Sequence, residues 1–515
     1  MSAKPSKIGT ALRVSASFVT MMIVIVMFAL VAVARPARPV DDVSSSGSSS
    51  SHEVRQRQIT AYCPARMSLP DATSYGDSEY QPSEGNIAST VRYAAFGAVY
   101  QAQFWKANDS AGERTTLADA DPTDDSRVLA ASADANNEAT IMSTQLLESA
   151  AGAGATASVA SSASEGDLRG VSAAVCQTPA LEHSFVLSGT PTGTTQQLVV
   201  DNPSAKATTV AITAWGTSQD GPIVFSTGST LTVGANNETV LDLSAAASGQ
   251  DALFVKVTSR QTPISAVVRT VSMDGLTAKG SDWQVPLATQ GKQLVFPTLA
   301  EGDKAALIVY AKDAGSVETQ WLGKNDAVST EASSHDYAGG KVTVIDLSSA
   351  PKGTQALSIR AEESVAAAVR VVRAGENGQE DFALINAASP ASSSAIAIPD
   401  GLQSRLALVN TAQADTKATI VAYDSEGRLL AQRDVELGTD ETTSLNTADL
   451  VSDDAEKASV AIVSLENGQD IAWGVRLSSN TLDKAKVAGV AYLGSSSLMP
   501  RNERIWADRD MTIVR

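Results

Sequence analysis

Short stretches in which apolar and polar residues alternate cover most of the chain after residue 59. Residues 208–215 (Thr-Thr-Val-Ala-Ile-Thr-Ala-Trp) and 253–257 (Leu-Phe-Val-Lys-Val) are typical, and turn-forming clusters such as residues 234–237 separate them. A period of two with β-branched residues predicts half-buried strands, and short strands between frequent turns are typical of sandwiches and barrels. The pattern therefore predicts an all-β chain of tandem immunoglobulin-like β-sandwich repeats, with a β-propeller as the alternative.

One uncharged apolar segment, Val14 to Ala34, differs from this pattern. A helix of about 20 residues crosses the hydrocarbon layer of a bilayer, so we expect a single transmembrane anchor here. Basic residues precede it, which favours a cytoplasmic N-terminus at residues 1–13 and a bulk that lies outside the plasma membrane. The alternative is a secreted protein whose signal peptide is cleaved near Ala34, at an A-x-A site.

A strand that ends in arginine recurs three times along the chain. Its copies end in Arg269, Arg370 and Arg476, and a divergent copy at residues 171–176 ends in cysteine. Spacings of roughly 100 residues predict about four sandwich domains. The expected organisation is a Ser/Pro-rich linker at 35–58, a divergent β-domain at 59–176, β-sandwich repeats at 177–273, 274–376 and 377–480, and a C-terminal strand and tail at 481–515.

Two further positions recur upstream of the arginines. Asp242 and Asp346 share one of them, and Trp215, Trp321 and Tyr423 share the other. Recurrence within a repeat indicates a shared structural need. We therefore expect the arginines to pair with the two aspartates on neighbouring strands and the aromatic residues to pack in the core. Ligand binding is the alternative for both sets.

The two cysteines bracket the first predicted domain. Cys63 opens it and Cys176 closes it. In a chain that leaves the cytoplasm, two cysteines that bracket one domain favour a disulfide. Free thiols with a redox or metal-binding role are the alternative, but the sequence has no C-x-x-C motif to support them.

Composition excludes several function classes. The 515 residues carry 39 Lys and Arg against 57 Asp and Glu, a net charge of −18, which argues against nucleic acid as a partner. Two cysteines and three histidines leave little material for a metal site. The sequence contains no nucleophile elbow, phosphate loop or dinucleotide fingerprint, so we predict no catalytic residue and no cofactor.

A few polar and aromatic residues retain alternatives. We expect His183 and His335 at the surface or at sheet edges, and the acidic residues between Asp119 and Asp125 in a solvated loop, with calcium ligation as the alternative. Trp105, Trp283 and Trp506 lie outside the recurrent aromatic position, so a stacking role remains open for any of them.

Three short motifs lie close together after the second cysteine: Cys-Gln-Thr-Pro at 176–179, Gly-Thr-Pro-Thr-Gly at 189–193 and Leu-Val-Val-Asp-Asn-Pro at 198–203. They resemble an actinobacterial family of single-pass cell-envelope proteins with a secreted β-rich region and no assigned activity. The resemblance covers the apolar segment and residues 170–480. It implies a Gram-positive cell surface and transfers no catalytic residue.

Together, these features favour a non-enzymatic envelope protein with a structural or binding role. Tandem modules on a tether would present loops to an envelope protein or a cell-wall glycan. A cell-wall or carbohydrate-active hydrolase is the alternative, because carboxylates in one divergent domain could act on a glycan.

Overall fold

The computed structural model describes residues 50–70, 81–109, 112–118, 128–226, 228–324, 328, 332–451 and 459–507. The predicted membrane anchor and the acidic stretch at 119–125 lie outside these residues. Among the residues that are described, none of the helices is long and apolar enough to cross a bilayer. Residues Arg55–Arg501 form one compact unit. In the other unit, β1 (Ser50–Arg55) pairs with β34 (Asn502–Ala507), so part of the predicted linker and tail is extended.

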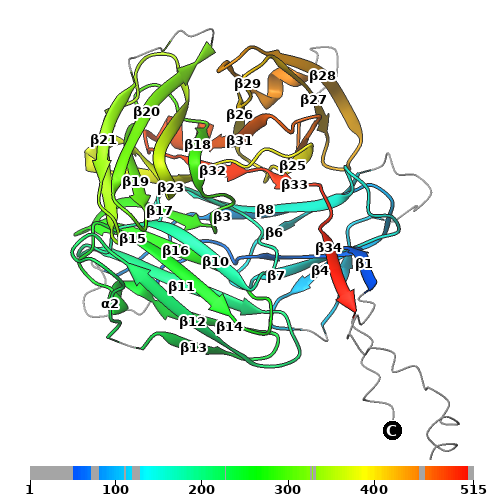
Figure 1. Ribbon diagram of the computed structural model, residues 1–515, viewed down its shortest axis with the longest axis horizontal. Helices are drawn as coiled ribbons and strands as arrows, with labels where there is room; N and C mark the ends of the chain where they lie inside the picture. The colour runs from blue at the N-terminus through cyan, green and yellow to red at the C-terminus, as the bar shows by residue number, and fades with distance from the viewer. Residues whose placement is uncertain are drawn as a thin grey trace, which may run out of the picture. The chain divides into compact units, whose positions relative to one another are not determined.

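The strands form where the sequence alternates. In β12 (Thr208–Trp215), Val210, Ile212 and Ala214 are buried, whereas the alternate residues Thr209 and Ala211 are exposed. Successive side chains of a strand point to opposite faces, so this alternation places one row of apolar groups inside a sandwich. The named strands of Arg55–Arg501 pair with one another in antiparallel sheets (Figure 1).

The strands assemble into consecutive pairs of sheets. The first pair contains β2 (Gln58–Cys63), β3 (Ala88–Phe96), β4 (Val99–Lys106), β5 (Thr115–Thr116), β6 (Leu129–Asp134), β7 (Thr140–Leu146), β8 (Gly154–Ala163) and β9 (Gly170–Val175). The second pair contains β10 (Glu182–Ser188), β11 (Thr194–Asn202), β12, β13 (Thr230–Val233), β14 (Asn237–Asp242), α2 (Leu243–Ala246), β15 (Ala252–Ser259), β16 (Ser265–Asp274) and β17 (Thr277–Gln284).

Two more pairs follow. The third contains β18 (Gly291–Pro297), β19 (Lys304–Tyr310), β20 (Gly315–Gly323), β21 (Ser333–Tyr337), β22 (Val342–Ser349), β23 (Thr354–Ala374), η3 (Glu376–Gly378) and β24 (Glu380–Asn386). The fourth contains β25 (Ser393–Ala397), β26 (Gln403–Asn410), β27 (Thr416–Tyr423), β28 (Leu429–Leu437), β29 (Thr442–Asn446), η4 (Thr447–Leu450), β30 (Ile462–Glu466), β31 (Ile471–Ser478), α3 (Asn480–Ala485), β32 (Ala491–Gly494) and β33 (Ser496–Ser497).

The same strand order recurs in these pairs. In the second pair one sheet runs β10-β15-β12-β13 and the other β14-β11-β16-β17, and the first pair has the corresponding orders β2-β7-β4-β5 and β6-β3-β8-β9. In the third pair the 21-residue β23 serves both sheets: its first half pairs with β18 and β20, and its second half pairs with β19 and β24. The first and second strands of each pair lie in different sheets, unlike strands A and B of the immunoglobulin fold, so that part of the prediction needs correction.

Each pair encloses an apolar core, and further apolar clusters lie between neighbouring pairs. One edge strand of each pair takes part in a cyclic series of contacts: β9 contacts β17, β17 contacts β24, β24 contacts β32, and β32 contacts β9. Asp381 at the start of β24 supports this arrangement, because its Oδ2 accepts hydrogen bonds of 2.9 Å from Val171 N and Val490 N. We call the contacts between successive pairs the first, second and third junctions, and those between the fourth and first pairs the closing junction.

The strand that follows each recurrent arginine shifts the expected domain limits. The limit predicted at residue 273 falls inside β16, the one at 376 falls in η3, and the one at 480 falls in α3. The reason is that β17, β24 and β32 each pair with the arginine-bearing strand before them. The sequences of β17, β24 and β32 share no motif. The repeat that can be recognised in the sequence therefore ends one strand before the structural unit does. Similarly, residues 171–176 overlap β9, the last strand of the first pair, whereas the corresponding arginine strands are next to last.

Candidate functional site

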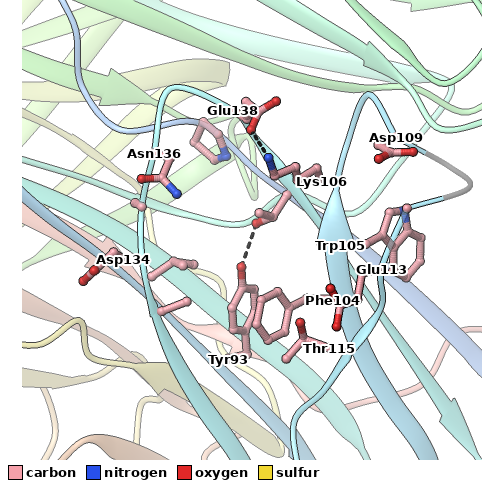
Figure 2. Close-up of a pocket in the computed structure, with 16 residues that line it drawn as sticks. Tyr93, Phe104, Trp105, Lys106, Asp109, Glu113, Thr115, Asp134, Asn136 and Glu138 are labelled. Atoms are coloured by element: carbon pink, nitrogen blue, oxygen red, sulfur yellow. Dashed lines mark hydrogen bonds and ion pairs between the residues drawn. The ribbon is translucent and has the colours of Figure 1, made fainter.

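A pocket of about 370 Å³ opens in the first sheet pair. Strands β3 and β4 supply its floor, and the chain around β6 and the start of β7 supplies one wall (Figure 2). Its volume is within the range of small-molecule sites in proteins, which are typically about 300–1,000 Å³. The pocket is therefore large enough for one sugar unit or one amino-acid side chain with its backbone.

The floor of the pocket is aromatic. The rings of Tyr93 and Phe104 stack with centroids 4.3 Å apart and an interplanar angle of 15°. Tyr93 is fully buried, and its hydroxyl lies 2.7 Å from Thr140 Oγ1. Burial raises the pKa of Tyr93 well above its usual value, so the hydroxyl stays protonated and can donate a hydrogen bond. The floor thus combines an apolar surface with one fixed polar group.

The rim of the pocket is acidic. Asp109, Glu113, Asp134 and Glu138 line it, and all four side chains are exposed. Lys106 is the one basic lining residue, and its Nζ contacts Glu138 at 2.5 Å. The formal charge of the lining residues is therefore −3, which favours a neutral polar or cationic ligand over an anion.

Trp105 adds a second aromatic surface at the rim (Figure 2). The guanidinium carbon of Arg114 lies 4.4 Å from its ring centroid, a cation–π contact. This contact demonstrates that the indole face is accessible to a cation. A sugar ring or an ammonium group could displace the exposed Arg114 from this face.

The disulfide lies beside this pocket. Cys63 and Cys176 are bonded, which confirms the prediction from the sequence. Pro64, the next residue after Cys63, lines the pocket. Tyr62 directly precedes Cys63, and Gln177 directly follows Cys176. These two residues exchange backbone hydrogen bonds of 2.8 and 2.7 Å. The disulfide therefore fixes one wall of the pocket and the entry to the second sheet pair together.

Two of the recurrent arginines lie at junctions between sheet pairs. Arg269 Nε donates to Gln197 Oε1 at 3.1 Å, and its Nη1 donates to Ser68 of the first pair. Arg476 donates to both carboxylate oxygens of Asp303 in the third pair, at 2.8 and 2.9 Å. Each therefore contacts the connection between the first two strands of the preceding pair.

Arg370 differs from the other two. Its guanidinium carbon lies 5.1 Å from the ring centroid of Phe382, and its Nε is buried with no hydrogen-bond partner among the described residues. Arg92 on β3 supplies the arginine at the closing junction, where it donates to Ile398 O at 2.8 Å and to Asp400. Arg92 is not part of the repeat in the sequence, because it lies on the second strand of its pair, whereas the recurrent arginines lie on a later strand.

The recurrent aspartates do not pair with the recurrent arginines, so that prediction is wrong. Asp242 Oδ1 accepts a 3.1 Å hydrogen bond from Ala245 N and begins α2, and Asp346 Oδ1 accepts a 2.8 Å hydrogen bond from Ser348 N. Such local bonds to the backbone are typical of aspartate. The register explains the outcome, because β11 lies between Asp242 and Arg269, and β19 lies between the corresponding strands of the third pair.

The recurrent aromatic residues pack in two different places. Trp321 is partly buried against the third core. Trp215 lies at the second junction, with its ring centroid 5.2 Å from that of Tyr310, and Tyr423 lies at the closing junction, 6.1 Å from Phe96. The expected packing role is thus shared between core and junctions.

Two outcomes could not be read from sequence spacing. His183 lies on β10, an edge strand, as one half of the prediction has it, but it is 5% exposed and its Nε2 lies 2.6 Å from Ile264 O, so it is not a surface histidine. Tyr93 and Phe104 carry no signal of their own in the sequence, because they belong to different strands and alternate like ordinary core residues. The run Phe104-Trp105-Lys106 beside an acidic segment was the one available signal.

Comparison with known families identifies part of the chain. Residues 128–448 match a family of unknown function, DUF5719. The chain belongs to the DUF5719 family. A search of curated proteins finds no match. The DUF5719 region begins at β6, so Tyr93, Phe104 and Trp105 precede it, whereas Asp134 and Glu138 lie within it.

Two solved structures show distant likenesses to this DUF5719 protein. Dimeric latent PorU from Porphyromonas gingivalis is 9% identical over 68% of this chain and 31% of its own, with a TM-score of 0.13. The Bacillus anthracis TIE protein is 8% identical over 86% of this chain and 75% of its own, with a TM-score of 0.10. This chain thus spans about a third of PorU, and neither likeness carries an argument about fold or function.

Proposed function

We propose that this protein is a membrane-anchored, extracytoplasmic cell-envelope protein that binds an amine-bearing or neutral glycan in the pocket of its first sheet pair. The observation that carries the proposal is the combination of an aromatic floor with an acidic rim. Aromatic faces attract cations and stack on apolar surfaces, while carboxylates accept hydrogen bonds from hydroxyl and ammonium groups. Together, they suit a sugar with hydroxyl or amino substituents.

The proposed location rests on two features. The apolar segment from Val14 to Ala34 has the length of a bilayer span, and basic residues precede it. The Cys63–Cys176 disulfide is typical of proteins that fold in an oxidising compartment. We propose a single-pass anchor with the N-terminus in the cytoplasm, and secretion after cleavage near Ala34 is the alternative.

We further propose that the chain is built from four copies of one two-sheet sandwich. The recurring strand order of the sheets supports this, as does the recurrence of arginines at the junctions. Because neighbouring sheets also pack across junctions, the copies would hold the pocket on a rigid support. Binding sites on rigid elements lose less entropy when a ligand is bound.

A glycan hydrolase is the second candidate, and the four rim carboxylates are the observation that favours it. A glycosidase needs one carboxylic acid that remains protonated, usually in apolar surroundings. The rim carboxylates are instead exposed to solvent. Binding without turnover therefore agrees better with the geometry.

A titration with defined oligosaccharides tests the proposal. The purified full chain would be titrated calorimetrically with glucosamine oligomers, N-acetylglucosamine oligomers and solubilised cell-wall glycan. We expect saturable binding that Trp105→Ala weakens about tenfold, since a cation–π or stacking contact contributes roughly 1–2 kcal/mol. Tyr100→Ala is the matched control, because Tyr100 lies on the same strand, is 62% exposed and does not line the pocket.

Two results would contradict this binding function. One is the absence of saturable binding to any of the three probes, and the other is an equal loss in both variants. The same mixtures would be assayed for new reducing ends. If the native chain produces new reducing ends in these mixtures, and Glu113→Gln or Asp134→Asn does not, the hydrolase is favoured.

A further inference from the structure

A second pocket lies at the third junction and has the opposite charge. Its volume is about 300 Å³, and residues of both the third and fourth sheet pairs line it. The charged residues of its lining are Arg373, Arg405, Arg476 and Glu301, a formal sum of +2 in a chain of net charge −18. This concentration of arginine is the feature that needs an explanation.

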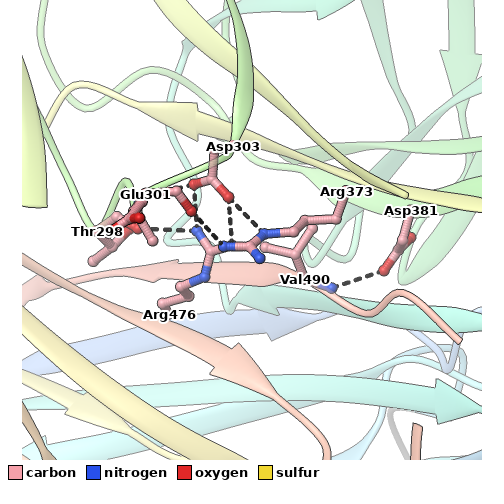
Figure 3. Close-up of polar contacts among 8 residues, drawn as sticks. Thr298, Glu301, Asp303, Arg373, Asp381, Arg476 and Val490 are labelled. Carbon is pink, nitrogen blue, oxygen red and sulfur yellow. Dashed lines mark hydrogen bonds and ion pairs between the residues drawn. The ribbon is translucent and has the colours of Figure 1, made fainter. Parts of the chain in front are cut away.

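One buried carboxylate holds two of these arginines in place (Figure 3). Asp303 is fully buried, accepts from Arg476 at 2.8 and 2.9 Å, and accepts from Arg373 Nε at 2.7 Å. Arg476 Nη1 also donates to Thr298 O at 3.2 Å, and Arg373 Nη2 donates to Glu301 O at 3.3 Å. Because a guanidinium has five N–H donors, Arg373 keeps donors that these contacts do not use.

The third arginine is less constrained. Arg405 is exposed, and Nη2 donates to Ser444 Oγ at 2.8 Å. Burial lowers the pKa of Arg476, Asp303 opposes that change, and the positive charges of Arg373 and Arg405 lower the pKa further. The attraction of Asp303 for Arg476 is therefore larger than the repulsion from either Arg373 or Arg405, and the three guanidiniums with Asp303 and Glu301 leave a formal charge of +1 at the pocket.

Two buried hydroxyls in the lining have no partner. Thr298 and Thr354 are 4% and 5% exposed, and among the described residues neither Oγ1 has a hydrogen-bond partner. Buried hydroxyl groups are usually paired, and an unpaired one is costly. Thr298 also has a φ of 74°, a strained conformation for a β-branched residue, of the kind that gathers at functional sites. Both features are consistent with a ligand that accepts hydrogen bonds.

We propose that this pocket binds a phosphate group, either as a free ion or as the phosphate of a lipid headgroup. Arginine forks and hydroxyl donors together match the oxygens of a phosphate, and a site of this volume holds one such group with a small substituent. The phosphate oxygens would accept hydrogen bonds from Arg373 and Arg405 and from the hydroxyls of Thr298 and Thr354. The negative charge of the phosphate would neutralise positive charge that Asp303 leaves uncompensated. This site is independent of the pocket in the first sheet pair.

Titration of the full chain with inorganic phosphate tests this site. We expect one saturable site that Arg405→Ala weakens about tenfold or more, because charge-assisted hydrogen bonds are the stronger ones. Arg433→Ala removes the same charge from an exposed position outside the pocket and is expected to leave the affinity unchanged. Thr354→Val keeps the shape of the side chain and is expected to weaken binding about threefold to tenfold by removing one donor.

A vesicle arm distinguishes the two sources of phosphate. Vesicles of phosphatidylglycerol in phosphatidylcholine would be compared with vesicles of phosphatidylcholine alone, using the full chain in both. Retention that depends on phosphatidylglycerol and on Arg405 supports a lipid headgroup, and phosphate binding without it supports a free ion. The proposal is overturned if inorganic phosphate shows no saturable binding, or if Arg405→Ala and Arg433→Ala behave alike.

Discussion

Two buried aspartates, Asp201 and Asp303, occupy junctions of the same kind but have opposite surroundings. Both are fully buried. Asp303 at the third junction contacts two arginines within 2.9 Å. Asp201 at the first junction faces Glu238 across the β11–β14 register, and neither of its carboxylate oxygens has a partner among the described residues. Asp303 thus lies beside two bases, whereas Asp201 lies beside another acid.

Arg370 adds the complementary case, a base that makes no ion pair among the described residues, although the charge of Glu380 opposes the lowering of its pKa by burial. Arg370 recurs at the position of Arg476, but its Nε has no partner among the described residues. The connection before β11, residues 189–193, contains no carboxylate, whereas the corresponding connection before β19 supplies Asp303. Recurrence therefore preserves the position of a long basic side chain at a junction, and the charge that compensates it differs from junction to junction.

Removing the counterion at the third junction should have the largest effect. Asp303→Asn keeps the shape of the side chain but leaves Arg373 and Arg476 without their anion. Breaking one side of a buried ion pair costs about 3–5 kcal/mol. We expect a loss of stability of this order, measured by chemical and thermal unfolding of the full chain.

An exposed ion pair of the fourth sheet pair provides the control. Lys417 and Glu436 contact each other at 2.5 Å, with 75% and 70% of their side chains exposed. Exposed pairs contribute little to stability, so Glu436→Gln should leave the unfolding transition in place. An equal effect of Asp303→Asn and Glu436→Gln would mean that burial does not separate the two kinds of ion pair.

Local features of this comparison could be predicted from the sequence, whereas partners across junctions could not. The alternation at 208–215 gave β12, and the placement of the two cysteines gave the disulfide. The first signal lies within a segment of eight residues, and the second follows from the presence of two cysteines in the chain. The partner of Arg476 lies 173 residues earlier in the chain, in a turn that repeat matching cannot rank above other acidic turns.

The candidate pocket was hidden for a similar reason. Tyr93, Phe104, Asp134 and Glu138 come from separate strands or turns, and no fixed spacing joins them. Residues 362–364 remain extended and make β23 continuous, so that one strand serves both sheets of the third pair. In each case, packing between sheets overrides what the local sequence favours.

Raising the pH should weaken the first junction before it affects the third. Burial, followed by repulsion from Glu238, raises the pKa of Asp201 to about 8. An unfolded aspartate titrates near 3.9, so between about pH 4 and pH 8 the folded chain holds a proton that the unfolded chain has lost. Stability is therefore fully present below pH 4 and falls as pH rises, by roughly 1.4 kcal/mol per pH unit for this group.

Asp201→Asn isolates this contribution. Between pH 6 and pH 7, the slope of the unfolding free energy against pH should decrease by about 1.4 kcal/mol per unit in the variant. The slope should not vanish, because burial also raises the pKa of Asp282 and Asp381. Identical slopes in the native chain and the variant would show that Asp201 is ionised throughout this range, and the difference between the two junctions would then disappear.

Replacing the base without a counterion should have the smallest effect. Arg370→Met keeps an unbranched chain over Phe382 and removes a guanidinium whose Nε has no partner among the described residues. The variant loses a cation–π contact, gains a sulfur–aromatic contact of similar strength, and no longer buries part of a charge. We expect the free energy of unfolding to change by no more than about 1 kcal/mol in either direction. Arg476→Met should instead lose about as much stability as Asp303→Asn. A loss at Arg370 as large as that at Arg476 would indicate that the shared position, not its counterion, determines the stability of both junctions.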